Sequence, residues 1–326
     1  MKMNNDDMEL GNGGKEMAAN VETMFYTRQT PWHGLGKKVD EAPDSRSALI
    51  LAGLDWNVRQ RKLITDDNIP VEGYLANVRD IDDKILGVVT DRYKVVQNRE
   101  AFSFTDSLLG EGVKYETAGS LQGGKKVWIL ARLPQKYIMS GDEIEPYLVF
   151  SNSHDGSGSI RVAVTPVRVV CQNTLNLALS KAKRTWATVH TGNVQGKLED
   201  ARNTLFYAGQ YMTELGKEFD NLRRIKLADA KAEEMVKDLL PIDASMPDIT
   251  RKNIRRQQED ILIRYHKAPD LLDIGRNGYR FINAVADFAT HADPIRRAGN
   301  YRESLFAKTV DGNPITDKAF QMVKAA

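Results

Sequence analysis

The pattern of apolar and polar positions changes near residue 192, and the part of the chain before it alternates short apolar runs with turn residues. Three stretches each hold two strand-like runs around a turn and predict β-hairpins, at residues 73–90, 114–133 and 145–170. Single strands are predicted at residues 55–64 and 92–96. Hairpin connections rather than crossovers predict an α+β fold with an antiparallel hairpin-built sheet and packing helices.

Helices are predicted between these strands, at residues 44–53, 99–109 and 172–183. Asp44 and Asn98 each precede such a helix and are expected to cap its first amides. Gly53 and Gly110 follow the last apolar positions and are expected to end the first two helices.

Beyond residue 192 the apolar positions follow a helical period. Eight of them recur at spacings of three and four, namely Leu198, Ala201, Leu205, Ala208, Met212, Leu215, Phe219 and Leu222. This heptad seam predicts a long helix over 198–222, packed either in an antiparallel helical hairpin inside the monomer or between the subunits of a homo-oligomer. Four more helices are predicted at residues 228–240, 248–266, 278–291 and 316–326. We divide the chain into a disordered tail (1–20), a mixed α+β domain (21–192) and a helical region (193–326).

Composition adds little about partners, because 46 basic and 44 acidic residues leave a net charge of only +2. The apolar share of 41% is typical of a soluble globular protein. The single cysteine, Cys171, excludes an internal disulfide and suits a reducing compartment; it is either an inert buried thiol or one activated at a helix start. No apolar run is long enough for a membrane span, and the polar opening lacks a secretory core, so we expect a cytoplasmic protein.

The stretch at residues 154–159 places two glycines between serines. Such glycines can expose backbone amides to a phosphate, or can supply the positive φ of a hairpin tip. The candidate phosphate loop consists of His154, Asp155, Gly156, Ser157 and Gly158, and a plain turn is the alternative. His154 and Asp155 point to opposite sides of an extended backbone, so they form no relay by themselves.

Positive charge is concentrated around this loop. Between residues 151 and 192 five basic residues face one acid, a local net charge of +4. Pro166 lacks an amide donor and is expected at an edge or a bulge, which would bring two of the arginines to one face, where they would suit phosphate contacts. A solvated face paired with acids is the alternative. The five residues are Arg161, Arg168, Lys181, Lys183 and Arg184.

Aromatic residues alternate with charge in the same part of the chain, and single-stranded bases stack on aromatic faces while cations track the backbone. The candidates for such contacts are Trp32, His33, Trp186, and Arg92 and Lys94 on either side of Tyr93. A basic face at residues 251–256 is either solvated or a second nucleic-acid contact.

Enzyme signatures are weak. The sequence holds no phosphate-binding Walker loop, no dinucleotide fingerprint and no histidine pair one helical turn apart. We therefore predict no catalytic residue, no metal and no cofactor. A metal-dependent nuclease remains an alternative, with residues 91–94 and 154–156 as its only candidates.

Three segments, TPWHGLG (30–36), TDRYKVVQNREAF (90–102) and SNSHDGSGSIRVAVTPVRVVCQNTL (151–175), resemble the phage/plasmid-like protein family, a group of unknown function found in bacteriophages, plasmids and bacterial genomes. The resemblance runs from about Met17 to near the end of the chain. It implies a protein of mobile DNA and brings no catalytic residues. Hairpins followed by packing helices are also similar in outline to RecT/Red-beta-type annealing proteins.

These observations lead us to expect a homo-oligomeric protein that binds single-stranded DNA and promotes annealing or recombination for a phage or mobile element. The alternatives are the nuclease, and a structural or host-interaction assembly protein that binds no DNA. The sequence leaves the choice between DNA and RNA open.

Overall fold

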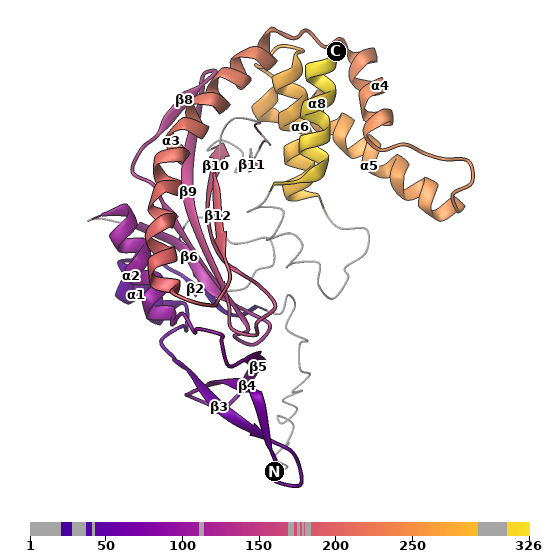
Figure 1. Cartoon of the computed structure of the whole chain (residues 1–326). Helices are drawn as coiled ribbons and strands as arrows, with labels where there is room; N and C mark the ends of the chain where they lie inside the picture. Colours follow the sequence, from indigo (N-terminus) through magenta and orange to yellow (C-terminus); the bar gives the residue numbers. More distant parts are fainter. Residues whose placement is uncertain are drawn as a thin grey trace, which may run out of the picture.

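The computed structural model of the chain describes residues 21–27, 37–40, 43–110, 114–168, 173–174, 177, 179, 184–292 and 312–326. The predicted tail at 1–20 lies outside these residues, as does most of the helix predicted at 172–183. The described part combines two antiparallel sheets with helices and ends in a helical region (Figure 1), so the predicted α+β class is confirmed.

The larger sheet, here called the main sheet, has nine strands in the order β11-β10-β9-β7-β6-β1-β2, with β12 beside β10 and β8 beside β9. All pairings are antiparallel except that of β1 with β2. Two predicted hairpins, β6–β7 and β9–β10, are confirmed, and Gly123 and Gly124 take positive φ at the first turn. The strands are β1 (Val21–Tyr26), β2 (Lys37–Lys38), β6 (Lys114–Leu121), β7 (Lys126–Arg132), β8 (Tyr137–Met139), β9 (Asp142–Ser153), β10 (Ile160–Arg168), β11 (Asn173–Thr174) and β12 (Thr185–Thr188).

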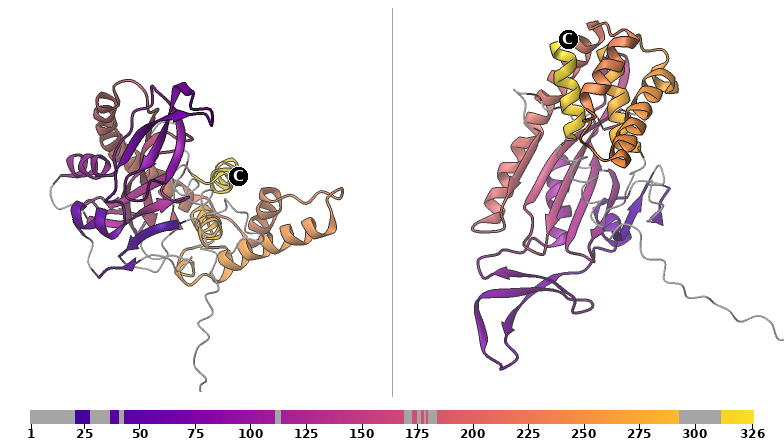
Figure 2. Two further views of the ribbon diagram at one scale, coloured as in Figure 1. Left: turned by 90° about the horizontal axis from the view of Figure 1, so that it is seen from below. Right: turned by 90° about the vertical axis from the view of Figure 1, so that its right-hand side faces the viewer.

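A second sheet, here called the small sheet, consists of β3 (Val58–Ile64), β4 (Pro70–Arg79) and β5 (Ile85–Thr90). It lies at one end of the molecule, away from the C-terminal helices (Figure 1; Figure 2, right). The predicted hairpin at 73–90 is confirmed, with Asp83 at φ +54° in its turn.

The strand predicted at 92–96 is wrong. These residues form a turn and an irregular segment, in which only Tyr93 makes an isolated bridge, to Thr191. The segment is rich in apolar residues because Tyr93 and Val96 are buried by tertiary contacts, not because it pairs as a strand.

Three helices, α1 (Ser45–Leu51), α2 (Asn98–Leu109) and the first part of α3 (Val194–Arg224), pack on one face of the main sheet (Figure 1). Asp44 caps α1 as predicted, since its Oδ1 accepts from the Ser47 amide at 2.8 Å, and Gly53 follows the helix at φ +64°. Asn98 is not the cap of α2: Gln97 caps it, while Asn98 lies inside the helix and donates to the Leu54 carbonyl.

The heptad seam lies on α3 and is buried inside the chain. Leu198, Ala201 and Ala208 join the core beneath the main sheet, whereas the later seam positions join the core of the C-terminal helices. Neither an antiparallel helical hairpin nor a second subunit is needed to bury these described positions; the side chain of Leu205 lies outside the described set. One helix therefore belongs to both cores.

The C-terminal region packs α4 (Asp229–Leu239), α5 (Asp248–Lys267), a short 3₁₀ turn η1 (Pro269–Leu271), α6 (Gly278–His291) and α8 (Pro314–Ala325). Every residue of α6 from Gly278 to Ala286 is buried, which confirms the prediction of a buried helix. Before Ile261, α5 contains no buried residue, and this part projects from the body (Figures 1 and 2).

The chain after β10 differs from the prediction, and the membrane prediction is the last to compare. Asn173 and Thr174, expected in a helix, pair with Val167 and Arg168 as strand β11, because β12 covers only the first half of β10. None of the helices in the described ranges has the length and apolar character needed to cross a bilayer.

Candidate functional site

The loop at residues 154–159 is the tip of the β9–β10 hairpin, and the small sheet packs directly on it. A Cβ added at Gly87 of β5 would lie 2.5 Å from the Asp155 Cα, and one added at Gly156 would lie 3.0 Å from Val89 Cγ1. The Asn77 side chain of β4 donates to the His154 carbonyl at 2.7 Å. We call this contact between the two sheets the junction.

Two amides of the candidate phosphate loop, those of Ser157 and Gly158, are already bonded to nearby side chains. The Asp155 carboxylate accepts from the Ser157 amide at 2.9 Å and from the Ser153 hydroxyl, and the Gly158 amide donates to Ser153 Oγ at 3.1 Å. Partial burial opposes ionisation of Asp155, but the hydrogen bonds from Ser153 and Ser157 outweigh it and lower the pKa of the carboxyl. The loop thus supplies its own anion.

His154 is fully buried at the centre of the junction. Its Nε2 lies 3.0 Å from Asn98 Oδ1, and because Asn98 Nδ2 donates to the Leu54 carbonyl, Oδ1 accepts and Nε2 carries the proton. Nδ1 has no partner. Burial, followed by the nearby His190, lowers the pKa of His154 to about 3, so the ring is neutral and does not contact a surface ligand.

The turn at Asp91–Lys94 meets the same loop. Tyr93 is buried, its hydroxyl donates to the Ser153 carbonyl, and its ring stacks on His190 with centroids 4.5 Å apart. His190 Nδ1 donates to the Lys94 carbonyl at 3.0 Å, while the Lys94 amide donates back to His190. Burial lowers the pKa of His190 and raises that of Tyr93. Two of the segments that carry the family resemblance therefore converge here.

Two of the predicted cations stand on the outside of this turn. Arg92 and Lys94 are exposed, and within the described part of the chain neither side chain makes an ion pair. Lys197 is half-buried, with its Nζ on the carbonyl of Thr191, the bridge partner of Tyr93. The turn therefore presents positive charge on a rigid support.

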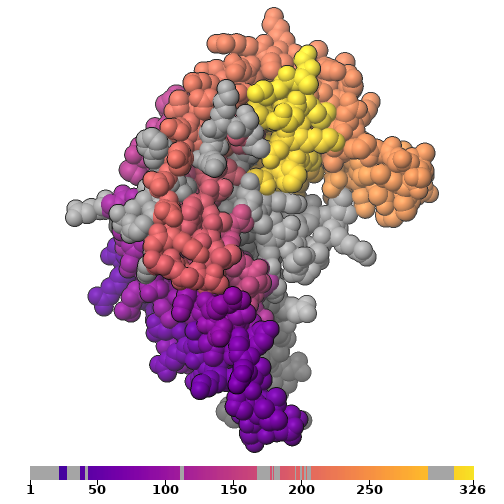
Figure 3. Space-filling view, viewed as in Figure 1, coloured from indigo at the N-terminus to yellow at the C-terminus, as the bar shows by residue number. Residues whose placement is uncertain are grey.

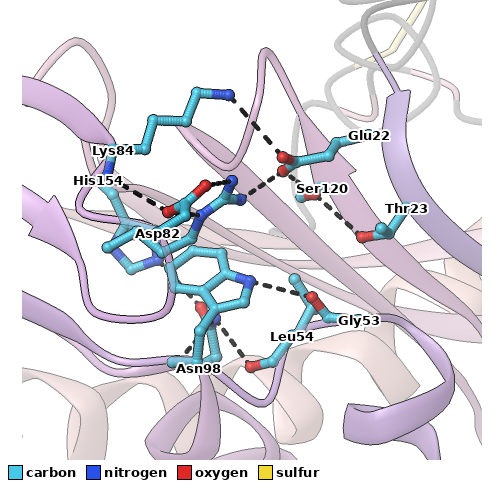
Figure 4. A network of polar contacts seen from close by, with 11 residues as sticks. Glu22, Thr23, Gly53, Leu54, Asp82, Lys84, Asn98, Ser120 and His154 are labelled. Carbon is cyan, nitrogen blue, oxygen red and sulfur yellow. Dashed lines mark hydrogen bonds and ion pairs between the residues drawn. The ribbon is translucent and has the colours of Figure 1, made fainter.

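Arg79, which the sequence analysis missed, joins the small sheet to the main sheet through Glu22, and it also bonds Asp82; both partners are labelled in Figure 4. The guanidinium is buried, lies 5.4 Å from the Trp56 ring, and bonds Glu22 at 2.7 Å and Asp82 at 2.6 Å. Its hydrogen bond is the largest cause that lowers the pKa of Asp82 to about 2. The sequence offered one signal for it, an arginine at the end of a strand followed by aspartates. The role of Arg79 is to hold the two sheets together.

The two members of the predicted basic strip whose side chains the structure describes, Arg161 and Arg184, do not share an exposed surface. Arg184 is buried, donates to the Val164 carbonyl at 3.3 Å and lies over the Tyr211 ring. Arg161 is half-buried on β10, and Trp186 is half-buried against the core beneath the main sheet. Several predictions concern positions outside the described residues: Trp32, His33, Lys181, Lys183, Cys171 and the side chain of Arg168.

Of the edge or bulge predicted at Pro166, the bulge is absent. The pairing of β10 with β9 runs without a shift from Arg161 to Arg168, so the alternation of side chains is not reset. On the other side of β10, β12 pairs with residues 160–163 and β11 with residues 167–168. Pro166 occupies the gap between those two partners, where no amide donor is required.

The described residues do not form a metal site. His154 Nδ1 and His190 Nε2 are buried and unpartnered, but no group of three potential ligands comes together among the described positions. The carboxylate pair on the main sheet, Glu116 and Glu145, is bridged by Arg132 at 3.5 Å on each side. That pairing satisfies both carboxylates with positive charge.

Fold and site together define an α+β protein in which a small sheet clamps a hairpin loop of a larger antiparallel sheet. A family model described as "Domain of unknown function (DUF932)" matches residues 85–309 of the 326, and the chain belongs to this family. The match covers β5, the turn, the loop and α6. No curated protein and no solved structure matches the chain.

Proposed function

We propose that this protein binds single-stranded DNA and promotes annealing or recombination for a phage or mobile element. The observation that carries the proposal is the turn at Asp91–Lys94, where the buried Tyr93 fixes a backbone that presents Arg92 and Lys94 to solvent. Neither cation has an ion-pair partner among the residues that the structure describes. Cations held on a rigid support lose little conformational freedom on binding phosphates.

The projecting part of α5 supplies a second group of free cations. Lys252, Arg255 and Arg256 are exposed at positions one turn apart, and among the described residues they make no ion pair, whereas Arg251 is paired with Asp248. This group and the turn lie in separate parts of the molecule (Figure 1). A flexible single strand can reach separated cations more readily than a stiff duplex.

The biological setting rests on the resemblance to phage and plasmid proteins, and annealing rests on the outline shared with RecT/Red-beta-type proteins. Both belong to the proposal, since membership of a family of unknown function carries no activity.

A salt titration with a labelled oligothymidylate tests the binding. Contacts from all five free cations predict a slope of log affinity against log salt of roughly −3 to −4, at about −0.7 per phosphate contact on single strands. A flat response, or no binding at low salt, would refute the proposal.

Charge-removing variants test the sites separately. The double variant Arg92→Gln, Lys94→Gln should reduce the magnitude of the slope by about 1.4, and the triple variant of Lys252, Arg255 and Arg256 to Gln by about 2.1. Lys217→Gln is the matched control, because that exposed lysine is paired with Glu214 one turn away on α3. Annealing is then measured as the rate at which two complementary labelled strands pair, with and without protein.

A further inference from the structure

The small sheet has one face docked on the main sheet, and we call the opposite face, which carries Tyr74, Val88 and Ile85, the free face. Ala76 and Val78 of the central strand lie on the same face but are buried. Asn77 and Gly87, which pair with each other, point toward the loop at 154–158, whereas the residues of opposite parity point away from it. Along β5, Val89 on the docked face is 4% exposed and Val88 on the free face is 55% exposed, and a register shift before Gly87 places Ile85 opposite Val78, on the free face. The free face belongs to the lobe at the lower end of Figure 3.

Tyr74 is the aromatic residue of this free face. It is 50% exposed, opposite Thr90, and its hydroxyl has no hydrogen-bond partner among the described residues. Val88 and Ile85 on the same face are 55% and 59% exposed. Arg61 of β3, which is opposite Ala76 of β4, adds a guanidinium whose only ion pair within the described ranges is an exposed one with Asp83.

The free cations of the turn begin beside this tyrosine. The Asp91 amide donates to the Gly73 carbonyl at 3.0 Å, so Arg92 follows a residue bonded to the immediate neighbour of Tyr74. An exposed aromatic ring thus lies at the same sheet end as unpaired positive charge. Single-stranded nucleic acid matches that combination, because its bases stack on aromatic rings while cations hold its phosphates.

We infer that the free face of the small sheet is a base-stacking surface, with Tyr74 as the platform and Arg61 and Arg92 beside it as phosphate contacts. The inference rests on the proposed function. It assigns a contact to the nucleobases, whereas the cations of the turn contact only the phosphates. The exposed pair of Arg61 with Asp83 does not block it, since an exposed ion pair contributes at most about 1 kcal/mol and a phosphate can replace the carboxylate.

The test compares an oligothymidylate with an abasic oligomer of the same length and phosphate number, by fluorescence anisotropy at low salt. Tyr74→Ala should weaken binding of the oligothymidylate by about 5- to 150-fold and leave binding of the abasic oligomer unchanged. Tyr74→Phe should retain the wild-type affinity for both. Tyr207→Ala, which removes an exposed tyrosine of α3, is the control and should change neither.

The outcomes separate the two proposals. If wild type binds neither oligomer, the proposed function fails and this inference fails with it. If wild type binds both but Tyr74→Ala matches wild type, or weakens both oligomers equally, the stacking surface alone is refuted. A Tyr74→Ala variant that sediments as a smaller species, with its oligonucleotide affinity unchanged, would instead assign the free face to contact with a second copy of the chain.

Discussion

Gly87 should be a position where even one methyl group separates the two sheets. An alanine Cβ there would lie 2.5 Å from Asp155 Cα, 2.8 Å from its carbonyl oxygen and 2.9 Å from its Cβ. All three distances are well inside van der Waals contact, and two of the atoms belong to the backbone of a loop that is fixed by its own hydrogen bonds. The loop must therefore move as a unit away from β5.

The expected cost follows from that movement. Overpacking of a tight contact costs about 1–3 kcal/mol, and losing the buried bond from Asn77 to the His154 carbonyl adds about 1–3 kcal/mol. Alanine regains about 0.5–1 kcal/mol over glycine within a strand. Gly87→Ala should thus lower the free energy of unfolding by about 1–5 kcal/mol and the melting temperature by about 2–8 °C. Urea denaturation followed by circular dichroism measures the first quantity, and amide exchange at Ser157 reports the loop directly.

Gly209→Ala on α3 is the matched control. An added Cβ there meets no atom within 4 Å, and alanine is favoured over glycine inside a helix by about 1 kcal/mol. The same substitution should therefore be neutral or stabilising at Gly209 and destabilising at Gly87. A Gly87→Ala protein as stable as wild type, with unchanged exchange at Ser157, would refute the close packing of the junction.

Further predictions concern titration, a buried cation and a helix cap. Burial lowers the folded pKa of His154 to about 3 and also lowers that of His190, whereas unfolded histidines titrate near 6.5, so the free energy of unfolding should be highest above about pH 6.5 and fall as the pH drops below it. His154→Gln should flatten the dependence of the urea midpoint on pH. An unchanged slope would contradict buried neutral rings. Arg280→Met should cost about 2–5 kcal/mol in thermal or urea unfolding, since three main-chain carbonyls lose their donor, while the exposed Arg276→Met should cost under about 1 kcal/mol; equal effects would count against the buried network. Asp44→Ala should destabilise by about 1 kcal/mol in the same assay, and Asp44→Asn, which can still cap, should restore most of that loss.

Local signals in the sequence predicted local structure well. The hairpin turns at Asp83 and Gly123-Gly124 are marked by residues that tolerate positive φ, and the structure has them there. Asp44 marked a helix start for the same kind of reason. These features depend on a few neighbouring residues, so one sequence is enough to find them.

Tertiary burial could not be predicted in the same way. Arg184 belongs to the most basic segment of the chain, yet its guanidinium points to a buried carbonyl and a tyrosine ring. The apolar residues at 92–96 suggested a strand, but Tyr93 is buried there because it stacks on His190, almost a hundred residues later in the sequence. In each case the deciding partner is distant in sequence, and neither charge nor periodicity identifies it.

The junction explains why a distinctive motif need not mark a ligand site. The histidine, aspartate and glycines of the loop are each engaged in holding one sheet against the other: the Asp155 carboxylate bonds loop amides, His154 is buried, and Gly156 makes room for Val89. Substituting them would disturb folding and binding together, so loss of activity in such variants would not identify a DNA contact. Arg92, Lys94 and Tyr74 stand outside that packing, on elements that the junction fixes. Function is therefore best sought in exposed residues one step away from the motif, where a substitution can change binding while leaving the supporting structure intact.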